Sequence, residues 1–243
     1  MKPSYNVPIV RRKLVAFETT EIAFDISKTM FRFTAGQYAT ITLPNTSDQP
    51  VTSQFHDFSI ASSPNDHQQL RIAIRNSTSF FKTTLLGYPL HTTVVLEGPS
   101  GVFTLPTATD IPLIFIAGGI GITPFMSMLQ YISETHQNYR VTLFYANRNG
   151  ASTAYAAELQ ELATRIPALK LVLIMTDDPQ WQGETRRLNA AVIKEYMGGN
   201  LDRYRSYTAG PPAMVTAMQT ELRQTGIKET NIIIESFTGY GQK

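Results

Sequence analysis

The residues of this sequence best suited to bind a ligand are three closely spaced glycines, Gly118, Gly119 and Gly121. They follow an apolar run, 113–117, that has the length and type of a strand buried on both faces. Thr123 can cap a helix, and Pro124 suits the first helical position, where no backbone donor is needed. The stretch therefore predicts a strand, a glycine turn and a helix N-terminus, whose backbone N–H groups could bind a pyrophosphate.

The glycine pattern alone leaves a second interpretation open, a tight strand-to-helix turn that binds nothing. Pro124 stands where the dinucleotide-binding fingerprint has its third glycine, so the motif is incomplete by itself. The rest of the chain must decide between the two interpretations.

Composition excludes several other kinds of site. The 243 residues include 0 Cys, which excludes disulfides, thiol catalysis and cysteine-ligated zinc or iron–sulfur centres within the chain. The histidines lie far apart and lack the spacing of a metal-binding helix, so we predict no metal site. A net charge of +2 argues against a nucleic-acid partner. With no signal-type start and no apolar run of ~20 residues, we expect a cytoplasmic protein without membrane insertion, its oligomeric state left open.

The first hundred residues are rich in strand patterns. Strands are expected within 10–26, 33–43, 55–61, 70–74 and 94–97, with one short helix over 80–86. Many strands separated by turn signals predict a closed antiparallel barrel. The cations from Arg11 to Lys13 fit either a solvated strand edge or a docking patch for an acidic partner.

Polar residues inside and after these strands suggest a ligand. His56 and Ser59 fall within a predicted strand, where a ligand or a neighbouring strand must satisfy them. Arg75 ends the next strand, and Lys82 and Thr83 follow a hydroxyl-rich stretch that could cap the short helix. Such a cluster could hold a phosphate group.

In the second half, strands alternate with helices. Strands are expected over 141–146, 170–175 and 205–209, and helices over 155–163, 189–197 and from 211 onward. This alternation predicts a parallel sheet, which binds ligands beyond the carboxyl ends of its strands. Asn147, Arg148 and Asp177 lie at those ends.

Six motifs occur along the chain in a fixed order: Gly36-Gln-Tyr38, His56-Asp-Phe-Ser59, Gly98-Pro-Ser-Gly-Val-Phe103, the turn from Gly118 to Pro124, Ala209-Gly-Pro-Pro-Ala-Met214 and Glu235-Ser-Phe-Thr-Gly-Tyr240. As an ordered set they resemble the ferredoxin–NADP reductase superfamily of flavoproteins, in a stand-alone form without an iron–sulfur domain. The resemblance implies a two-domain β plus α/β fold. A six-stranded antiparallel Greek-key flavin-binding barrel would span 1–107, and a Rossmann-like parallel α/β nucleotide-binding domain would span 108–243.

The resemblance also assigns residues to two cofactors, FAD rather than FMN, and NADH or NADPH. The residues implied for the flavin are His56, Asp57, Phe58, Ser59, Ile74, Arg75, Lys82, Thr83, Gly98, Gly101 and Phe237. Those implied for NAD(P) are Gly118, Gly119, Gly121, Thr123, Pro124, Asn147, Arg148, Asp177, Gly210, Pro211 and Met214. Ser59, Glu235 and Phe237 would be catalytic: Ser59 near flavin N5, Glu235 relaying a proton, and Phe237 covering the flavin face opposite Phe58.

Two positions depart from the family pattern. His56 replaces an arginine that usually faces the flavin pyrophosphate, and Ala209 replaces a cysteine beside the hydride path. A neutral imidazole offers one donor and no full charge. Asp177 stands about where NADPH-preferring relatives carry arginine, which favours NADH, although Arg148 could pair with a 2′-phosphate.

The resemblance implies an oxidoreductase that transfers a hydride from NAD(P)H to FAD and passes electrons to a separate acceptor. That acceptor could be a ferredoxin or flavodoxin, free flavin, oxygen, or a haem or iron partner. Two alternatives stay open. One is an electron-transfer subunit that is inactive outside a larger complex, and the other is a flavin or nucleotide sensor without turnover.

Overall fold

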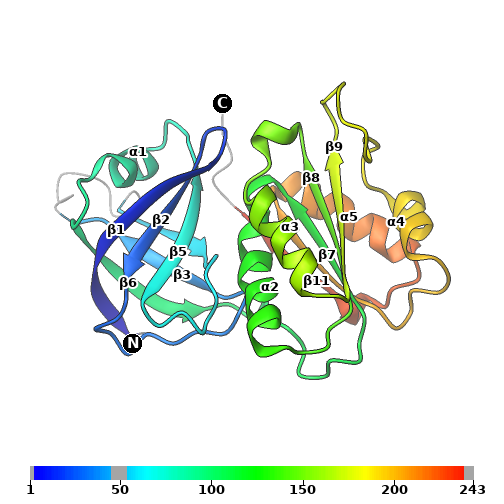
Figure 1. The fold of residues 1–243 in the computed structure, drawn as a ribbon, viewed down its shortest axis with the longest axis horizontal. Coiled ribbons are helices and arrows are strands. Elements are labelled where there is room, and N and C mark those ends of the chain that lie inside the picture. Colours follow the sequence, from blue (N-terminus) through cyan, green and yellow to red (C-terminus); the bar gives the residue numbers. More distant parts are fainter. Residues whose placement is uncertain (1–2, 45–53, 238–243) are drawn as a thin grey trace.

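The computed structural model describes residues 3–44 and 54–237, which form two halves packed side by side (Figure 1). The first half is built from six strands: β1 (Ser4–Ala16), β2 (Thr19–Asp25), β3 (Tyr38–Thr42), β4 (Phe55–Ser59), β5 (Gln69–Arg75) and β6 (Thr93–Ser100). They form one six-stranded antiparallel sheet, as predicted, and the strand order is β4-β3-β6-β1-β2-β5. The short helix α1 (Phe80–Gly87) covers this core with Phe81 and Leu85.

The prediction that this sheet closes into a barrel was wrong. No ladder joins β4 to β5 among the described residues. Past the end of β4, a backbone hydrogen bond links this edge to β5, where the Ala61 N–H donates to the Arg71 carbonyl at 2.7 Å. The sheet is therefore barrel-like but open, and residues of both edge strands border a cavity described below.

The second half is a five-stranded parallel sheet covered by helices. Its strands are β7 (Leu113–Gly118), β8 (Val141–Asn147), β9 (Leu169–Met175), β10 (Arg205–Gly210) and β11 (Ile232–Ser236), in the order β11-β10-β7-β8-β9. Every residue of β7 is buried, in line with its central position. The parallel α/β arrangement confirms the predicted fold class, although the sequence patterns did not predict β11.

Helices cover both faces of this sheet. Helices α2 (Thr123–Thr135) and α3 (Ala156–Arg165) share an apolar cluster with one face, and α4 (Ala190–Met197) and α5 (Pro212–Gln224) with the other. Short 3₁₀ turns lie at Gly119–Ile122, Gly150–Ser152 and Glu229–Asn231. Within the described residues, none of the helices is both long and apolar enough to cross a bilayer.

Helix α2 lies between the two halves (Figure 1) and is buried on all sides over its first two turns. The cluster that holds it includes Ala61, Ala73 and Phe103 of the first half. An amphipathic surface helix would leave one face polar. The pattern of α2 instead reflects two neighbours, one on each side.

The start of α2 differs from the prediction at Thr123. The residue before the helix is Ile122, and the Thr123 hydroxyl donates to the Ile120 carbonyl at 3.1 Å instead of capping the helix. The reason is the 3₁₀ turn, which runs directly into the helix and leaves no separate cap position. Pro124 lies in the first turn as predicted.

The first sheet ends at Ser100 and the second begins at Leu113. The domain boundary at 107 and 108 falls in this connector and stays a prediction.

Candidate functional site

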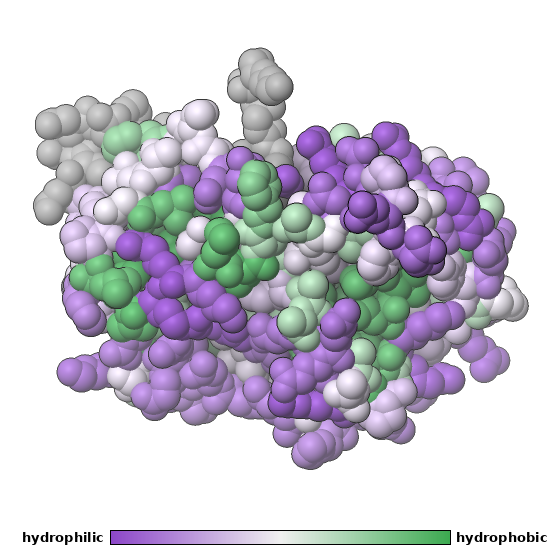
Figure 2. Space-filling model, turned by 45° about the horizontal axis from the view of Figure 1, so that its top comes forward, coloured by the Kyte–Doolittle hydropathy of each residue, from purple (hydrophilic) through white to green (hydrophobic). Residues whose placement is uncertain are grey.

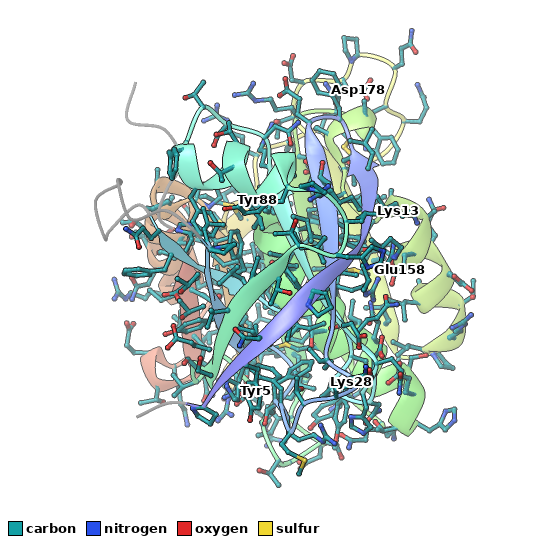
Figure 3. All side chains as sticks on the ribbon, turned by 90° about the vertical axis from the view of Figure 1, so that its left-hand side faces the viewer. Tyr5, Lys13, Lys28, Tyr88, Glu158 and Asp178 are labelled. Carbon is teal, nitrogen blue, oxygen red and sulfur yellow. The ribbon has the colours of Figure 1, made fainter. Side chains whose placement is uncertain are left out.

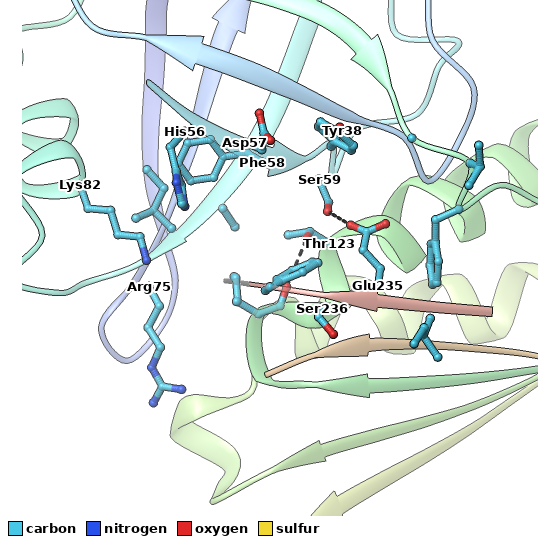
Figure 4. A pocket seen from close by; sticks show the side chains of 18 of the residues that line it. Tyr38, His56, Asp57, Phe58, Ser59, Arg75, Lys82, Thr123, Glu235 and Ser236 are labelled. Atoms are coloured by element: carbon cyan, nitrogen blue, oxygen red, sulfur yellow. Dashed lines mark hydrogen bonds between the residues drawn. The ribbon is translucent and has the colours of Figure 1, made fainter. Parts of the chain in front are cut away.

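A cavity of about 580 Å³ lies where the two halves meet (Figure 4). This volume is within the range of cofactor-binding pockets, about 300–1,000 Å³. The first half contributes Tyr38, Phe55, His56, Asp57, Phe58, Ser59, Ala73, Ile74, Arg75, Lys82, Gly101, Val102 and Phe103. The second half contributes Ile120, Thr123, Ile233, Ile234, Glu235, Ser236 and Phe237.

Aromatic rings form one wall of this cavity. Strand β4 places Phe58 on the buried side of the sheet and His56 beside it, with the two rings edge to face at 4.9 Å between centroids. The His56 ring also lies 5.7 Å from that of Phe81. Burial and the positive charge of Lys82 lower the pKa of His56, and Asp57 only partly opposes them. At neutral pH the imidazole is therefore uncharged.

Two cations lie at the same end of the cavity as His56 (Figure 4). Lys82 comes from α1 and Arg75 from the end of β5. Burial lowers the pKa of Lys82 from its ordinary value of 10.5. A cationic end next to an aromatic wall fits a ligand that joins a flat ring to a diphosphate, which is the chemistry of FAD.

At the other end of the cavity, a hydrogen bond joins the two halves. The Ser59 hydroxyl donates to Oε1 of Glu235 at 2.5 Å (Figure 4). Burial raises the pKa of Glu235, and the bond from Ser59 only partly offsets this. The carboxyl therefore holds a proton to higher pH than an exposed glutamate does. Phe237 follows on the same strand end, and its N–H donates to the Gly210 carbonyl at 3.0 Å.

A second cavity of about 320 Å³ lies beyond the glycine turn. It is lined by Arg75, Gly118, Gly119, Ala146, Asn147, Arg148, Ser152, Thr176, Pro211 and Met214. Arg75 borders both cavities. The buried side-chain amide nitrogen of Asn147 has no hydrogen-bond partner within the described ranges. An unpaired buried donor in a cavity wall fits a polar ligand such as a dinucleotide.

The three glycines of the turn have different surroundings. A side-chain carbon at Gly121 would lie 2.2 Å from the Ala209 carbonyl oxygen, and one at Gly118 would lie 2.1 Å from the Met214 sulfur. Gly119 has a φ of +54°, and the atom nearest to a side-chain carbon placed there would be Nη1 of Arg75 at 3.8 Å. Packing therefore explains Gly118 and Gly121, whereas Gly119 faces open space where a phosphate could approach.

Several predicted site residues lie away from both cavities. The Thr83 hydroxyl donates to the carbonyls of Ser79 and Phe80 at the start of α1. A hydroxyl cap was expected for this helix, but the Ser79 side chain makes no capping hydrogen bond. Gly98 and Asp177 are not part of either cavity wall, and Asp177 is exposed. Tyr240 of the last motif lies outside the described residues.

Sequence reasoning missed other residues that border the cavities. Thr176 and Ser152 lie in the second cavity, and Ile233 and Ile234 in the first. The rule that ligands bind beyond strand carboxyl ends could have found Thr176, which directly follows β9. The two isoleucines belong to β11, which gave no recognisable pattern.

The structure accounts for most of the cationic run at the start of the chain. Arg11 pairs with Glu21 at 2.9 Å, and Arg12 donates to the carbonyls of Leu85 and Tyr88. Lys13 is exposed on β1 (Figure 3). With both arginines bonded inside the chain, the run does not offer a strong docking patch for an acidic partner.

On the face drawn in Figure 2, apolar residues form separate green patches within a mostly polar surface. Val102, Phe55 and Ile234 are exposed and border the first cavity. No cluster of potential metal ligands occurs among residues 3–44 and 54–237.

Comparisons with known proteins match both halves in order. The family described as "FAD-binding domain" matches residues 4–104, and "Oxidoreductase NAD-binding domain" matches residues 115–220. The chain is 31% identical over 210 residues to the phenol 2-monooxygenase reductase component DmpP of Pseudomonas sp. strain CF600, covering 84% of this chain and 58% of that protein. It is 29% identical to the anthranilate 1,2-dioxygenase electron transfer component of Acinetobacter baylyi, covering 93% and 64%. The chain thus spans about three fifths of the length of these curated relatives.

Solved structures show the same fold. The Amycolatopsis cytochrome P450 reductase GcoB superposes with a TM-score of 0.85 at 20% identity, covering 99% of this chain and 72% of that one. A ferredoxin NADP+ reductase from Neisseria gonorrhoeae, solved with FAD and NADP, superposes with a TM-score of 0.81 at 18% identity, covering 96% and 98%.

Proposed function

The chain belongs to the ferredoxin–NADP reductase superfamily of FAD- and NAD-binding oxidoreductases, and from this premise we propose that it transfers electrons from NADH through FAD to a separate oxygenase-type acceptor. One observation supports this most directly. Two cavities, one between the two halves and one beyond the glycine turn, share Arg75 in their walls. A flavin and a dinucleotide held there would be brought together between the two halves.

When bound, FAD and NADH supply the redox chemistry, a hydride moving from nicotinamide to flavin and electrons leaving toward the acceptor. The chain's own residues would hold and orient these groups. Phe58 and Phe237 border the first cavity, and Arg75 and Lys82 supply charge for a diphosphate. At the second cavity, the Asn147 amide and the turn at Gly119 offer donors.

We assign the Ser59–Glu235 pair to proton handling. The raised pKa of Glu235 favours the protonated carboxyl, and the Ser59 hydroxyl, 2.5 Å from Oε1, could relay a proton between this carboxyl and the cavity. Ala209 is fully buried on β10 beside the turn, so it fills space there without offering a polar or polarisable group.

We also propose a preference for NADH over NADPH. Asp177 and Asp178 directly follow Thr176, which lines the second cavity, and Oδ2 of Asp178 accepts the Gly150 N–H at 3.1 Å. A carboxylate 4 Å from a phosphate charge costs about 4 kcal/mol at an effective dielectric near 20. Arg148, which lines the cavity, opposes this only in part, because two acids directly follow Thr176 of the same wall.

The acceptor is inferred from the relatives. They are described as the reductase component of a phenol 2-monooxygenase and the electron transfer component of a dioxygenase. An oxygenase component is therefore the acceptor we propose for this chain. The alternative, a subunit that is inactive outside a complex, predicts no flavin reduction by the isolated chain.

Anaerobic mixing tests the proposal. Purified protein is loaded with FAD and titrated separately with NADH and NADPH while flavin absorbance is followed. We expect NADH to bleach the flavin, and NADPH to do so only at higher concentration. Absence of bleaching with both nucleotides would refute the proposed reductase activity of the isolated chain.

A further inference from the structure

A buried polar network joins the two halves away from both cavities. At its centre, Arg71 of β5 donates from Nη1 to Glu21 at 3.1 Å and from Nη2 to Gln130 of α2 at 2.8 Å. Nη2 also lies 3.4 Å from Glu158 of α3, whose Oε1 accepts the Gln130 amide at 2.8 Å. Glu21, only 2% exposed, is further paired with Arg11.

The charges in this network are balanced, and Arg71 remains cationic. Burial lowers the pKa of Arg71, but the negative charges of Glu21 and Glu158 raise it by more. Buried ion pairs contribute little net stability compared with apolar packing, because both charges must be desolvated. The apolar cluster around α2 already holds the halves together. The network is therefore better suited to fixing the relative orientation of the two halves, because a planar guanidinium can hydrogen-bond its partners in only a few arrangements.

The backbone of Arg71 is also hydrogen-bonded to residues next to the first cavity, where FAD would bind. Its backbone N–H donates to the Ser62 hydroxyl at 3.1 Å, and its carbonyl accepts the Ala61 N–H at 2.7 Å. These two bonds fix the chain directly after Ser59, the serine of the proton-handling pair. On its own strand, Arg71 is followed by 73–75, which line the same cavity.

On the nucleotide side, the network holds the helix that begins at the glycine turn. Gln130 lies about 10 Å along α2 from Thr123, at the rise of about 1.5 Å per residue. A rotation of about 5° around this contact would displace the start of α2 by about 1 Å. A displacement of about 1 Å between reacting groups can slow a reaction about 100-fold.

We propose that Arg71 is a positioning residue, which sets the orientation of the nucleotide-binding half on the flavin-binding half through Glu21, Gln130 and Glu158. Its effect on rate rests on the proposed function, because it acts on the distance between flavin and nicotinamide. Its effect on the arrangement of the halves does not depend on that function.

The arrangement of the halves can be measured with two spin labels. The chain has 0 Cys, so Lys28→Cys and Asp202→Cys, both at exposed positions, give one specific label on each half; Lys28 is visible in Figure 3. We expect Arg71→Met to broaden or shift the distance distribution. The matched control is Arg165→Met, because Arg165 pairs with Glu161 of its own helix. Identical distributions for Arg71→Met and the control would overturn the proposal, whether or not the protein reduces flavin.

Kinetics test the consequence for hydride transfer. In Arg71→Met we expect the bleaching rate at saturating NADH to fall roughly 10-fold or more, while the half-saturating NADH concentration and FAD affinity change less than about 3-fold. An unchanged saturating rate would overturn the positioning role even if the distances broaden. Failure of the proposed function itself would appear separately, as no bleaching in the parent protein.

A second variant keeps the test decisive if Arg71→Met does not fold. The double change Gln130→Leu with Glu158→Ala removes only the nucleotide-side partners and leaves Arg71 paired with Glu21. We expect the same broadening and the same fall in saturating rate. A wild-type distance distribution and rate in this variant would overturn the proposal.

Discussion

Replacing Gly121 by alanine tests how the glycine turn is packed. The added carbon would lie 2.2 Å from the Ala209 carbonyl oxygen and 2.7 Å from the Gly210 Cα, so ordinary contact at 3.4 Å requires backbone to move by more than 1 Å. The atoms belong to β10, which is held by β7 on one side and β11 on the other. Because no flexible side chain can give way, we expect Gly121→Ala to destabilise the second half by about 3 kcal/mol or more.

The neighbouring glycines provide matched comparisons. At Gly118 the clash is with the end of the Met214 side chain, which can rotate away, so Gly118→Ala should destabilise by only about 1 kcal/mol. At Gly119 nothing clashes, but φ is +54°, and we expect Gly119→Ala to cost about 1–2 kcal/mol through backbone strain. Packing therefore predicts a larger loss of stability for Gly121→Ala than for the other two substitutions. A role in ligand binding alone would not predict this difference.

Urea unfolding followed by tryptophan fluorescence measures this order. The single tryptophan, Trp181, lies between β9 and α4 and reports on the second half alone. With a slope near 2 kcal/mol per M, a loss of about 3 kcal/mol lowers the urea midpoint by about 1.5 M. If Gly121→Ala unfolded within about 0.5 kcal/mol of the parent protein, or no lower than Gly118→Ala, the packing argument would be refuted.

Three further predictions concern the cavities. Because the pKa of Glu235 is raised in the folded protein, the free energy of unfolding should fall as the pH rises through the titration range of this carboxyl. Glu235→Gln should remove this fall and should be more stable than the parent protein at neutral pH. Thermal unfolding at several pH values measures both effects. Lys82→Met should weaken FAD binding about 10-fold by flavin-fluorescence titration at low salt, whereas His56→Gln, which replaces a neutral donor, should change it less than about 3-fold; equal effects would contradict the charge assignment. Asp178→Ser should improve the NADPH-to-NADH ratio of kcat/KM about 10-fold, and an unchanged ratio would remove Asp178 from coenzyme selection.

The regular elements were predictable from local patterns. The run before Gly118 has the composition of a central strand, and it is the middle strand of the parallel sheet. Strand β11 escaped detection because Ile232 to Ile234 are three consecutive isoleucines without the alternation of a half-buried strand. Its position beside β10 is set by the parallel sheet, which no local pattern in that segment reveals.

Features that depend on long-range contacts were not predictable. Closure of the first sheet is decided by whether β4 and β5 meet, and turn signals carry no information about that. The prediction that Thr123 caps α2 was wrong because a 3₁₀ turn, stabilised by packing around Gly121, runs directly into the helix. The side-chain partners of Arg71 lie 50 to 87 positions away from it in the chain, so in the sequence they look like ordinary surface polar residues.

The packing of helix α2 limits how the two halves can be exchanged between related proteins. The first two turns of α2 are buried, and the apolar cluster around them has members from both halves, so the helix as a whole must fit two partners. A chimera that joins this flavin-binding half to a foreign nucleotide-binding half at the connector would bring in a helix shaped for another barrel. Successful exchange therefore requires that the residues of α2 packed against Ala61, Ala73 and Phe103 be retained from this chain, although they lie in the second half.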